Sequence, residues 1–111
     1  IAQSGKNHVI RYSDQPPVDG LRPCANIMFE SLSDTDYDDI TCVVLTGMGA
    51  DGTKGIQSLV DKGRRVHVIA QDAESCIVYG MPRAIAEAGL ANEIQPLNKI
   101  SESIIKNVGV M

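Results

Sequence analysis

A nearly continuous apolar run extends from Ile40 to Thr46, with no alternation of apolar and polar positions. Such a run is typical of a strand that is covered on both faces, as in a parallel sheet. A second run of this type spans residues 63–72. The segment between them, Thr53–Lys62, has helical periodicity, so we expect a strand, a helix and a parallel strand in succession. The apolar residues of this helix share one face: Ile56, Leu59 and Val60.

Shorter patterns precede this unit. Two extended runs, 1–3 and 8–12, flank a glycine-containing turn and predict a hairpin at an edge. A helix is expected from Pro23 to about Ser33, because proline is favoured in the first turn of a helix. The apolar residues of this helix are Ile27, Met28 and Leu32 on the inner face, with Phe29 on a neighbouring face.

Further elements follow the second strand. A short turn or helix over 74–79 breaks at Gly80, and a helix is expected from Pro82 to about Ala88. A brief strand over 93–97 then leads into an amphipathic helix over 97–108. The residues of this last helix that we expect to point inward are Ile100, Ile104 and Ile105.

These elements predict an α/β protein with a three-layer, doubly wound, mostly parallel sheet of the Rossmann-like type, incomplete and preceded by an N-terminal hairpin. With 111 residues the chain forms one domain at most. It starts at Ile1, directly in an apolar segment, so we expect a piece of a longer protein.

Composition narrows the function classes. The net charge of −4 leaves no basic surface for nucleic acid or an anionic membrane. The sequence has no apolar run of about 18 residues, the length that a membrane-spanning helix needs, so we expect no membrane insertion. Cys24, Cys42 and Cys76 form no CxxC pair and lie in apolar surroundings, which is typical of reduced, structural cysteines in a cytoplasmic protein.

An acidic segment separates the first helix from the apolar strand. Its carboxylates could bind a divalent cation, but the glycine and the terminal glutamate of an EF-hand loop are missing. We therefore interpret the segment as a solvated loop, and we expect no metal and no organic cofactor. Its acidic residues are Asp34, Asp36, Asp38 and Asp39.

The candidate site is the glycine-rich turn Gly47–Gly52, which follows the apolar strand and carries one carboxylate, Asp51. A loop at the carboxyl end of a parallel strand is the usual place for a functional site in an open α/β sheet. An aspartate there commonly orients a histidine that activates a hydroxyl nucleophile. His8 lies in the expected hairpin and His67 in the middle of a strand, so no complete triad can be assembled from these residues.

A nucleotide site is the main alternative. Gly47, Gly49 and Gly52 fit GxGxxG between a strand and a helix, and Asp72 ends the next strand, as in a dinucleotide fingerprint. Against it, Asp51 would stand at the helix N-terminus where the pyrophosphate must bind, so two anions would compete for one positive site. A non-catalytic interaction domain of the same fold is a further alternative.

Three segments resemble the catalytic domain of the chemotaxis protein-glutamate methylesterase: LTGMGADG at 45–52, QDAESCIVYGMPRA at 71–84 and PPVDGLRPCANIMFES at 16–31. The resemblance covers nearly the whole chain, 1–111, as the carboxy-terminal part of a larger α/β domain. It implies a cytoplasmic hydrolase of a two-component system, fused behind a receiver domain of the response-regulator type. It also implies a substrate, since such enzymes hydrolyse glutamyl methyl esters and deamidate glutamines on methylated chemoreceptors.

The resemblance further implies roles for single residues. Asp51 is similar to the triad aspartate, and Met48 to a residue that shapes the oxyanion and substrate pocket. The remaining pocket residues by resemblance are Gly47, Gly49, Tyr79 and Met81. The serine and the histidine of the family precede the region that is represented here, so we expect this chain alone to be inactive. Missing strands would also leave a sheet edge with unpaired N–H and C=O groups, which predicts self-association of the chain.

Overall fold

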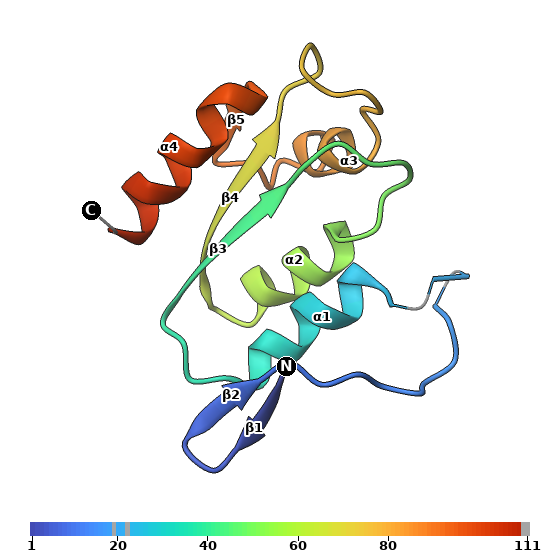
Figure 1. Ribbon diagram of the computed structural model, residues 1–111, viewed down its shortest axis with the longest axis vertical. Helices are drawn as coiled ribbons and strands as arrows, with labels where there is room; N and C mark the ends of the chain where they lie inside the picture. The colour runs from blue at the N-terminus through green and yellow to red at the C-terminus, as the bar shows by residue number, and fades with distance from the viewer. Residues whose placement is uncertain (19, 22, 110–111) are drawn as a thin grey trace.

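The computed structural model describes residues 1–18, 20–21 and 23–109 (Figure 1). Three parallel strands form the main sheet in the order β3-β4-β5, and β1 and β2 form a separate antiparallel hairpin. This arrangement confirms the α/β class. In chain order the elements are β1 (Ala2–Ser4), β2 (Asn7–Val9), α1 (Ala25–Ser31), the 3-10 helix η1 (Leu32–Asp34), β3 (Asp39–Val44), α2 (Thr53–Asp61), β4 (Arg65–Gln71), α3 (Met81–Glu87), β5 (Glu93–Gln95) and α4 (Leu97–Val108).

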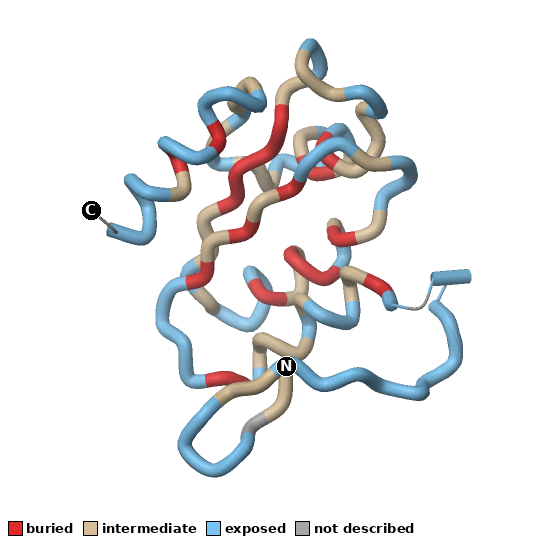
Figure 2. Tube along the Cα trace, in the orientation of Figure 1, coloured by how far each residue is buried: buried red, intermediate tan, exposed pale blue. Residues whose placement is uncertain are grey.

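Helices cover both faces of the sheet. On one face, alternate residues of β3 and β4 form the main core with residues of α2 and α3. Figure 2 shows the buried residues of these elements in red. On the other face of β4, which α4 covers, Ile69 is fully buried. The buried residues of the main core are Ile40, Cys42, Val44, Ile56, Leu59, Val68, Ala70 and Ile85.

The β3 edge of the sheet has no neighbouring strand in the described part of the chain. Among the described residues β3 pairs with β4 alone, so the N–H and C=O groups along its other side have no strand partner. The same strand carries Leu45 just beyond its end, and that side chain is 43% exposed. β3 is therefore an edge strand, although its apolar sequence is typical of a central one.

The predicted inward faces were wrong at several positions. Phe29 of α1 and Leu32 of η1 pack against the core, whereas Ile27 and Met28 are 37% and 43% exposed. The reason is that α1 packs mainly against α2 rather than against the sheet, which rotates its buried side by about one residue. Two further apolar residues that were expected to be inward are largely exposed, Val60 and Ile105.

The hairpin is shorter than its pattern suggests. Its second strand ends at Val9, and Ile10 and Tyr12 are exposed. The nitrogen atom of Ile1, before the hairpin, lies 2.8 Å from Oγ of Ser31 at the end of α1. None of the helices in the described part of the chain is long and apolar enough to span a membrane.

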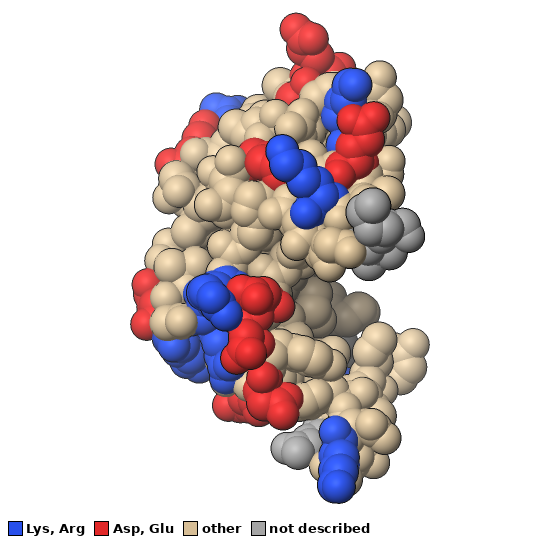
Figure 3. Space-filling view, turned by 90° about the vertical axis from the view of Figure 1, so that its left-hand side faces the viewer, with Lys and Arg blue, Asp and Glu red and all other residues tan. Residues whose placement is uncertain are grey.

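The four acidic residues of the segment 34–39 are exposed, as predicted, but the segment is only partly a loop, because Asp34 ends η1 and Asp39 begins β3. Arg64 holds it from the end of α2, because its guanidinium donates to the carbonyl oxygens of Ser33 at 2.8 Å and Thr35 at 2.6 Å. Arg65 pairs with Asp39 at 3.1 Å. Acidic and basic side chains intermix on the face that Figure 3 shows, so that face presents no uniformly basic surface to a polyanion.

α1 and α2 approach each other closely at one glycine. A Cβ atom on Gly55 would lie 2.7 Å from the carbonyl oxygen of Asn26 and 2.8 Å from Cβ of Phe29. The first of these atoms is main chain, so it can yield only if α1 moves. Gly55 therefore sets the distance between the two helices.

The variant Gly55→Ala tests this contact. Alanine in a helix interior is favoured over glycine by about 1 kcal/mol, so a free position would become more stable. Here we expect the opposite sign, a net loss of about 1–3 kcal/mol from overpacking. Urea denaturation measures it, with Lys54→Ala on the exposed side of α2 as the control. A Gly55→Ala protein more stable than the parent would show that the helices are not in contact there.

Candidate functional site

The turn after β3 is fastened to the loop that precedes α3. The N–H of Gly47 donates to the carbonyl oxygen of Val78 at 3.0 Å. In return, the carbonyl oxygen of Gly47 accepts the N–H groups of Gly80 at 3.0 Å and Met81 at 2.8 Å. A Cβ atom on Gly80 would lie 2.5 Å from that same oxygen, so the two loops meet at main-chain distance. Backbone hydrogen bonds to the loop before α3 therefore hold the turn in place.

Most of the predicted pocket residues come together in this junction. Tyr79 forms an isolated parallel β-bridge with Gly47. Met81 packs against the turn, since its sulfur would lie 2.8 Å from a Cβ atom on Gly47. Gly49 has a φ of 85°, which favours glycine. Met48 projects outward and is 86% exposed. In the described part of the chain the N–H groups of Met48 and Gly49 donate no hydrogen bond.

A buried glutamine supports the turn, and sequence reasoning missed it. Gln71 is 1% exposed at the end of β4. Its Oε1 accepts the N–H of Thr46 at 2.8 Å, and its Nε2 donates to the carbonyl oxygen of Ser75 at 2.8 Å. The side chain thus joins the end of β3 to the loop after β4. The sequence signal that could have indicated this role is a polar residue at the end of an otherwise apolar strand.

The carboxylate of Asp51 lies against the N-terminus of α1. Oδ2 accepts the N–H of Ala25 at 2.7 Å, and Oδ1 accepts the N–H of Asn26 at 3.0 Å. The thiol of Cys24, the N-cap residue of α1, lies 3.3 Å from Oδ1. The first N–H groups of a helix have no partner within the helix and carry its positive end, so they are suited to an anion.

These contacts determine the charge of Asp51. Burial opposes ionisation, but the hydrogen bonds from the backbone of Ala25 and Asn26 outweigh it, with further ones from Cys24 and from the backbone of Gly52. The pKa of Asp51 therefore lies below its ordinary value of 3.8, and the group is a carboxylate at neutral pH. A fixed anion of this kind can orient a histidine and stabilise its protonated form.

The positive end of α2 is also occupied, by a side chain. Oδ1 of Asn26 accepts the N–H of Gly52 at 2.9 Å and the N–H of Gly55 at 2.8 Å. The carboxylate of Asp51 thus binds the N-terminus of α1 and not, as the sequence suggested, that of α2, where Asn26 satisfies the N–H groups. Those groups are unavailable to a pyrophosphate, so the GxGxxG interpretation gains no support.

Neither histidine contacts Asp51. The Nε2 atom of His67 lies 2.6 Å from Oε2 of Glu93 on the face of the sheet that α4 covers. This bond, above all, lowers the pKa of Glu93 to about 2. The Nε2 atom of His8 lies 3.4 Å from Asp36 beside the hairpin. Both histidines are tied to structural partners, in agreement with their positions in the sequence.

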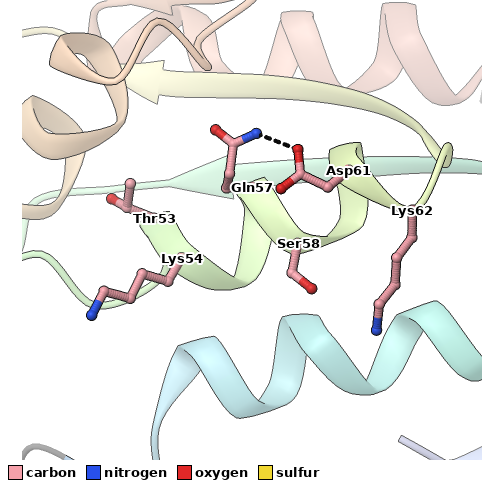
Figure 4. Close-up of a pocket in the computed structure, with 6 residues that line it drawn as sticks. All are labelled: Thr53, Lys54, Gln57, Ser58, Asp61 and Lys62. Atoms are coloured by element: carbon pink, nitrogen blue, oxygen red, sulfur yellow. Dashed lines mark hydrogen bonds between the residues drawn. The ribbon is translucent and has the colours of Figure 1, made fainter.

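A shallow hollow runs along α2. In Figure 4 its side chains all come from that helix and the residue after it, and Lys62 points toward α1. Nε2 of Gln57 donates to Oδ1 of Asp61 at 2.9 Å. Asp51 and the turn do not line it, so the hollow lies outside the candidate site. Its lining residues are Thr53, Lys54, Gln57, Ser58, Asp61 and Lys62.

Comparisons with known proteins identify relatives over almost the whole chain. The CheB methylesterase family model matches residues 1–104. The protein-glutamate methylesterase/protein-glutamine glutaminase of Desulfotalea psychrophila is 44% identical over 107 residues, which cover 96% of this chain and 29% of that protein. Protein-glutamate methylesterase/protein-glutamine glutaminase 2 of Pseudomonas aeruginosa is 38% identical, with 96% and 30% covered. The chain thus spans about 30% of the length of the curated relatives that it matches.

A solved structure has the same fold. The crystal structure of the Thermotoga maritima CheB methylesterase catalytic domain superposes with a TM-score of 0.74 at 35% sequence identity. The match covers 83% of this chain and 48% of that domain.

The contribution of Asp51 to stability should depend on pH in a defined direction. Asp51→Asn replaces one acceptor oxygen by an NH₂ group that faces a backbone N–H, so we expect a loss of about 1–3 kcal/mol at pH 6. Because the folded pKa is lowered, this stabilisation is complete above the ordinary value of 3.8 and is lost as the pH falls below it. The difference between variant and parent should therefore shrink toward pH 2.

Urea denaturation at pH 6, 4 and 2.5 measures this difference. The control is Asp38→Asn, because Asp38 is an exposed carboxylate in the acidic loop and should change stability little at any of these pH values. A loss for Asp51→Asn that stayed constant over this range would mean that the charge of Asp51 does not stabilise α1.

Proposed function

The chain belongs to the CheB methylesterase family, and we propose that it supplies the triad aspartate, Asp51, of a protein-glutamate methylesterase. The single observation that carries the proposal is the position of the Asp51 carboxylate, which the N–H groups of Ala25 and Asn26 hold at a strand-end turn. The serine and the histidine of the triad come from residues upstream of Ile1 in a longer protein.

The geometry leaves room for the histidine. A carboxylate offers about four lone-pair positions. Ala25, Asn26 and Cys24 occupy three of them, two on Oδ1 and one on Oδ2. The backbone N–H of Gly52 stabilises the carboxylate as well. We propose that Oδ2, which accepts the N–H of Ala25, is the oxygen that also accepts the Nδ1–H of an imidazole. This bond would select the tautomer whose other nitrogen removes the serine proton.

The turn supplies the second part of the chemistry. In the reaction the serine attacks the ester carbonyl, and the carbonyl oxygen becomes an oxyanion that needs hydrogen-bond donors. The N–H groups of Met48 and Gly49 are uncommitted in the described residues, and the bonds between Gly47 and Met81 hold their turn in place. Donors that are fixed before the reaction stabilise the charge without reorganisation, so this turn is our candidate for the oxyanion hole.

The proposed substrates are glutamyl methyl esters on chemoreceptors, and glutamines that are deamidated at similar positions. The exposed Met48 side chain would contact such a protein substrate beside the reacting group. We further propose that a receiver domain precedes the catalytic domain and that the protein acts in the cytoplasm. Neither step of the hydrolysis uses a metal or an organic cofactor.

Methanol release from methylated receptor tests the function. We expect none from the chain of 111 residues alone and a measurable rate from the same chain extended upstream. In the extended protein, Asp51→Asn should lower kcat by about 10⁴-fold, because the wrong histidine tautomer is then favoured. Asp38→Asn is the control and should retain the parental rate. Equal rates for both variants would exclude Asp51 from the triad.

The free edge of β3 suggests how the longer protein is completed. An upstream strand would pair with this edge, and upstream residues would supply a partner for Thr53 Oγ1, a buried oxygen with no hydrogen bond in the described part of the chain. Without them, a second copy can pair with the same edge. We therefore expect the short chain to sediment as dimers or larger species and the extended chain as a monomer. A monomeric short chain that binds no apolar dye would contradict this expectation.

A further inference from the structure

In the candidate site, the free N–H groups at the start of α1 and of α2 bind side chains from each other's region. Those of α1 bind a residue in the turn before α2, and those of α2 bind a residue of α1. Asp51, in the turn before α2, accepts the N–H groups of Ala25 and Asn26 in α1. Asn26, in the first turn of α1, accepts the N–H groups of Gly52 and Gly55 at the start of α2. We name this arrangement the reciprocal cap, and it consists of Asp51, Asn26, Gly52 and Gly55.

Asn26 holds Asp51 at two points. Its own N–H binds the carboxylate oxygen Oδ1 at 3.0 Å. Its side-chain Oδ1 binds the N–H of Gly52, and this N–H belongs to the peptide group that follows Asp51 directly. A single residue of α1 therefore fixes the position of both the main chain and the side chain of Asp51.

The turn needs such an anchor because glycines lie on both sides of Asp51. Gly49 has a φ of 85° and Gly52 a φ of 104°. Glycine permits these angles at no steric cost, but it also leaves the backbone free to leave them. Within the turn, the bond that spans Asp51 is a long one, from the N–H of Thr53 to the carbonyl oxygen of Ala50 at 3.4 Å. The position of the carboxylate therefore depends mainly on its contacts with α1.

The length of the Asn26 side chain suits only a close helix pair. Its Oδ1 reaches Gly55 at 2.8 Å because that residue has no side chain. A Cβ on Gly55 would come within 2.9 Å of Cα of Asn26. The two features are matched: the glycine allows the approach, and the asparagine uses it to fasten the turn.

We propose that Asn26 is a positioning residue for the triad aspartate: by capping α2 it holds Asp51 in the orientation that the histidine requires. This inference rests on the proposed function for its effect on the reaction, but the displacement of Asp51 can be measured without activity. Asn26 does not touch the substrate in this proposal. It acts through Asp51 alone.

The kinetic experiment uses the extended, active protein. Displacement of a catalytic group by about 1 Å can cost 10²-fold in rate, so Asn26→Ala should lower kcat by about 10²-fold. KM should change by less than about twofold, because ground-state binding does not involve Asp51. Asn26→Asp keeps an oxygen acceptor for both N–H groups and should recover most of the rate.

The matched control is Asn92→Ala. Oδ1 of Asn92 accepts the N–H of Val68 at 2.8 Å, so it is also an asparagine that binds a backbone N–H group, at a place outside the reciprocal cap. Asn92→Ala should lower stability but leave kcat at the parental value. If Asn26→Ala and Asn92→Ala have the same kcat, while Asp51→Asn is impaired, Asn26 has only a structural role and the inference is wrong.

Amide hydrogen exchange gives the readout that needs no activity. The N–H of Ala25 binds Asp51 and does not contact the Asn26 side chain. Its exchange should accelerate at least tenfold in Asn26→Ala and stay at the parental rate in Asn92→Ala. Unchanged exchange at Ala25 in Asn26→Ala would overturn the inference even if the protein had no esterase activity. If Asp51→Asn alone is without kinetic effect, the proposed function fails and exchange at Ala25 decides the role of Asn26.

Discussion

The structure of the candidate site depends on one electrostatic contact, the carboxylate of Asp51 at the positive end of α1. The carboxylate accepts hydrogen bonds from two consecutive backbone N–H groups and from the thiol of Cys24. Since a helix N-terminus stabilises an anion within its first turn, the contact keeps Asp51 ionised and also satisfies N–H groups that α1 cannot satisfy itself. The same carboxylate thus stabilises the fold and is positioned for the proposed chemistry.

The surrounding glycines serve the same contact by bringing main chains together. Gly55 lets α1 approach α2, and Gly80 lets the loop before α3 approach Gly47. The turn between β3 and α2 is consequently clamped from two sides, by α1 at Asp51 and by the loop 78–81 at Gly47. Such a turn can keep N–H groups uncommitted without collapsing onto other acceptors, as an oxyanion site requires.

The elements with strong local patterns could be predicted from the sequence, and the contacts between distant residues could not. Thr53–Lys62 has the apolar spacing and the terminal glycine of a helix, and α2 differs from it by one residue. The buried side of α1 was wrong because packing on α2, rather than periodicity, selects Phe29 over Ile27 and Met28. The sequence singles out Asp51 as the candidate site residue, but it gives no sign of Asn26, since a side chain that caps a helix 26 residues later leaves no local signature.

If Asp51 is the triad aspartate, as we propose, its two roles explain why a carboxylate fits this position better than a neutral acceptor. A triad aspartate must stay charged beside a histidine while it is partly removed from water, and burial alone would raise its pKa. The hydrogen bonds of α1 reverse that shift before any histidine is present. The charge is therefore in place in this part of the chain, and the residues that would complete a triad need only contribute the histidine and the nucleophile to a site whose anion is already oriented.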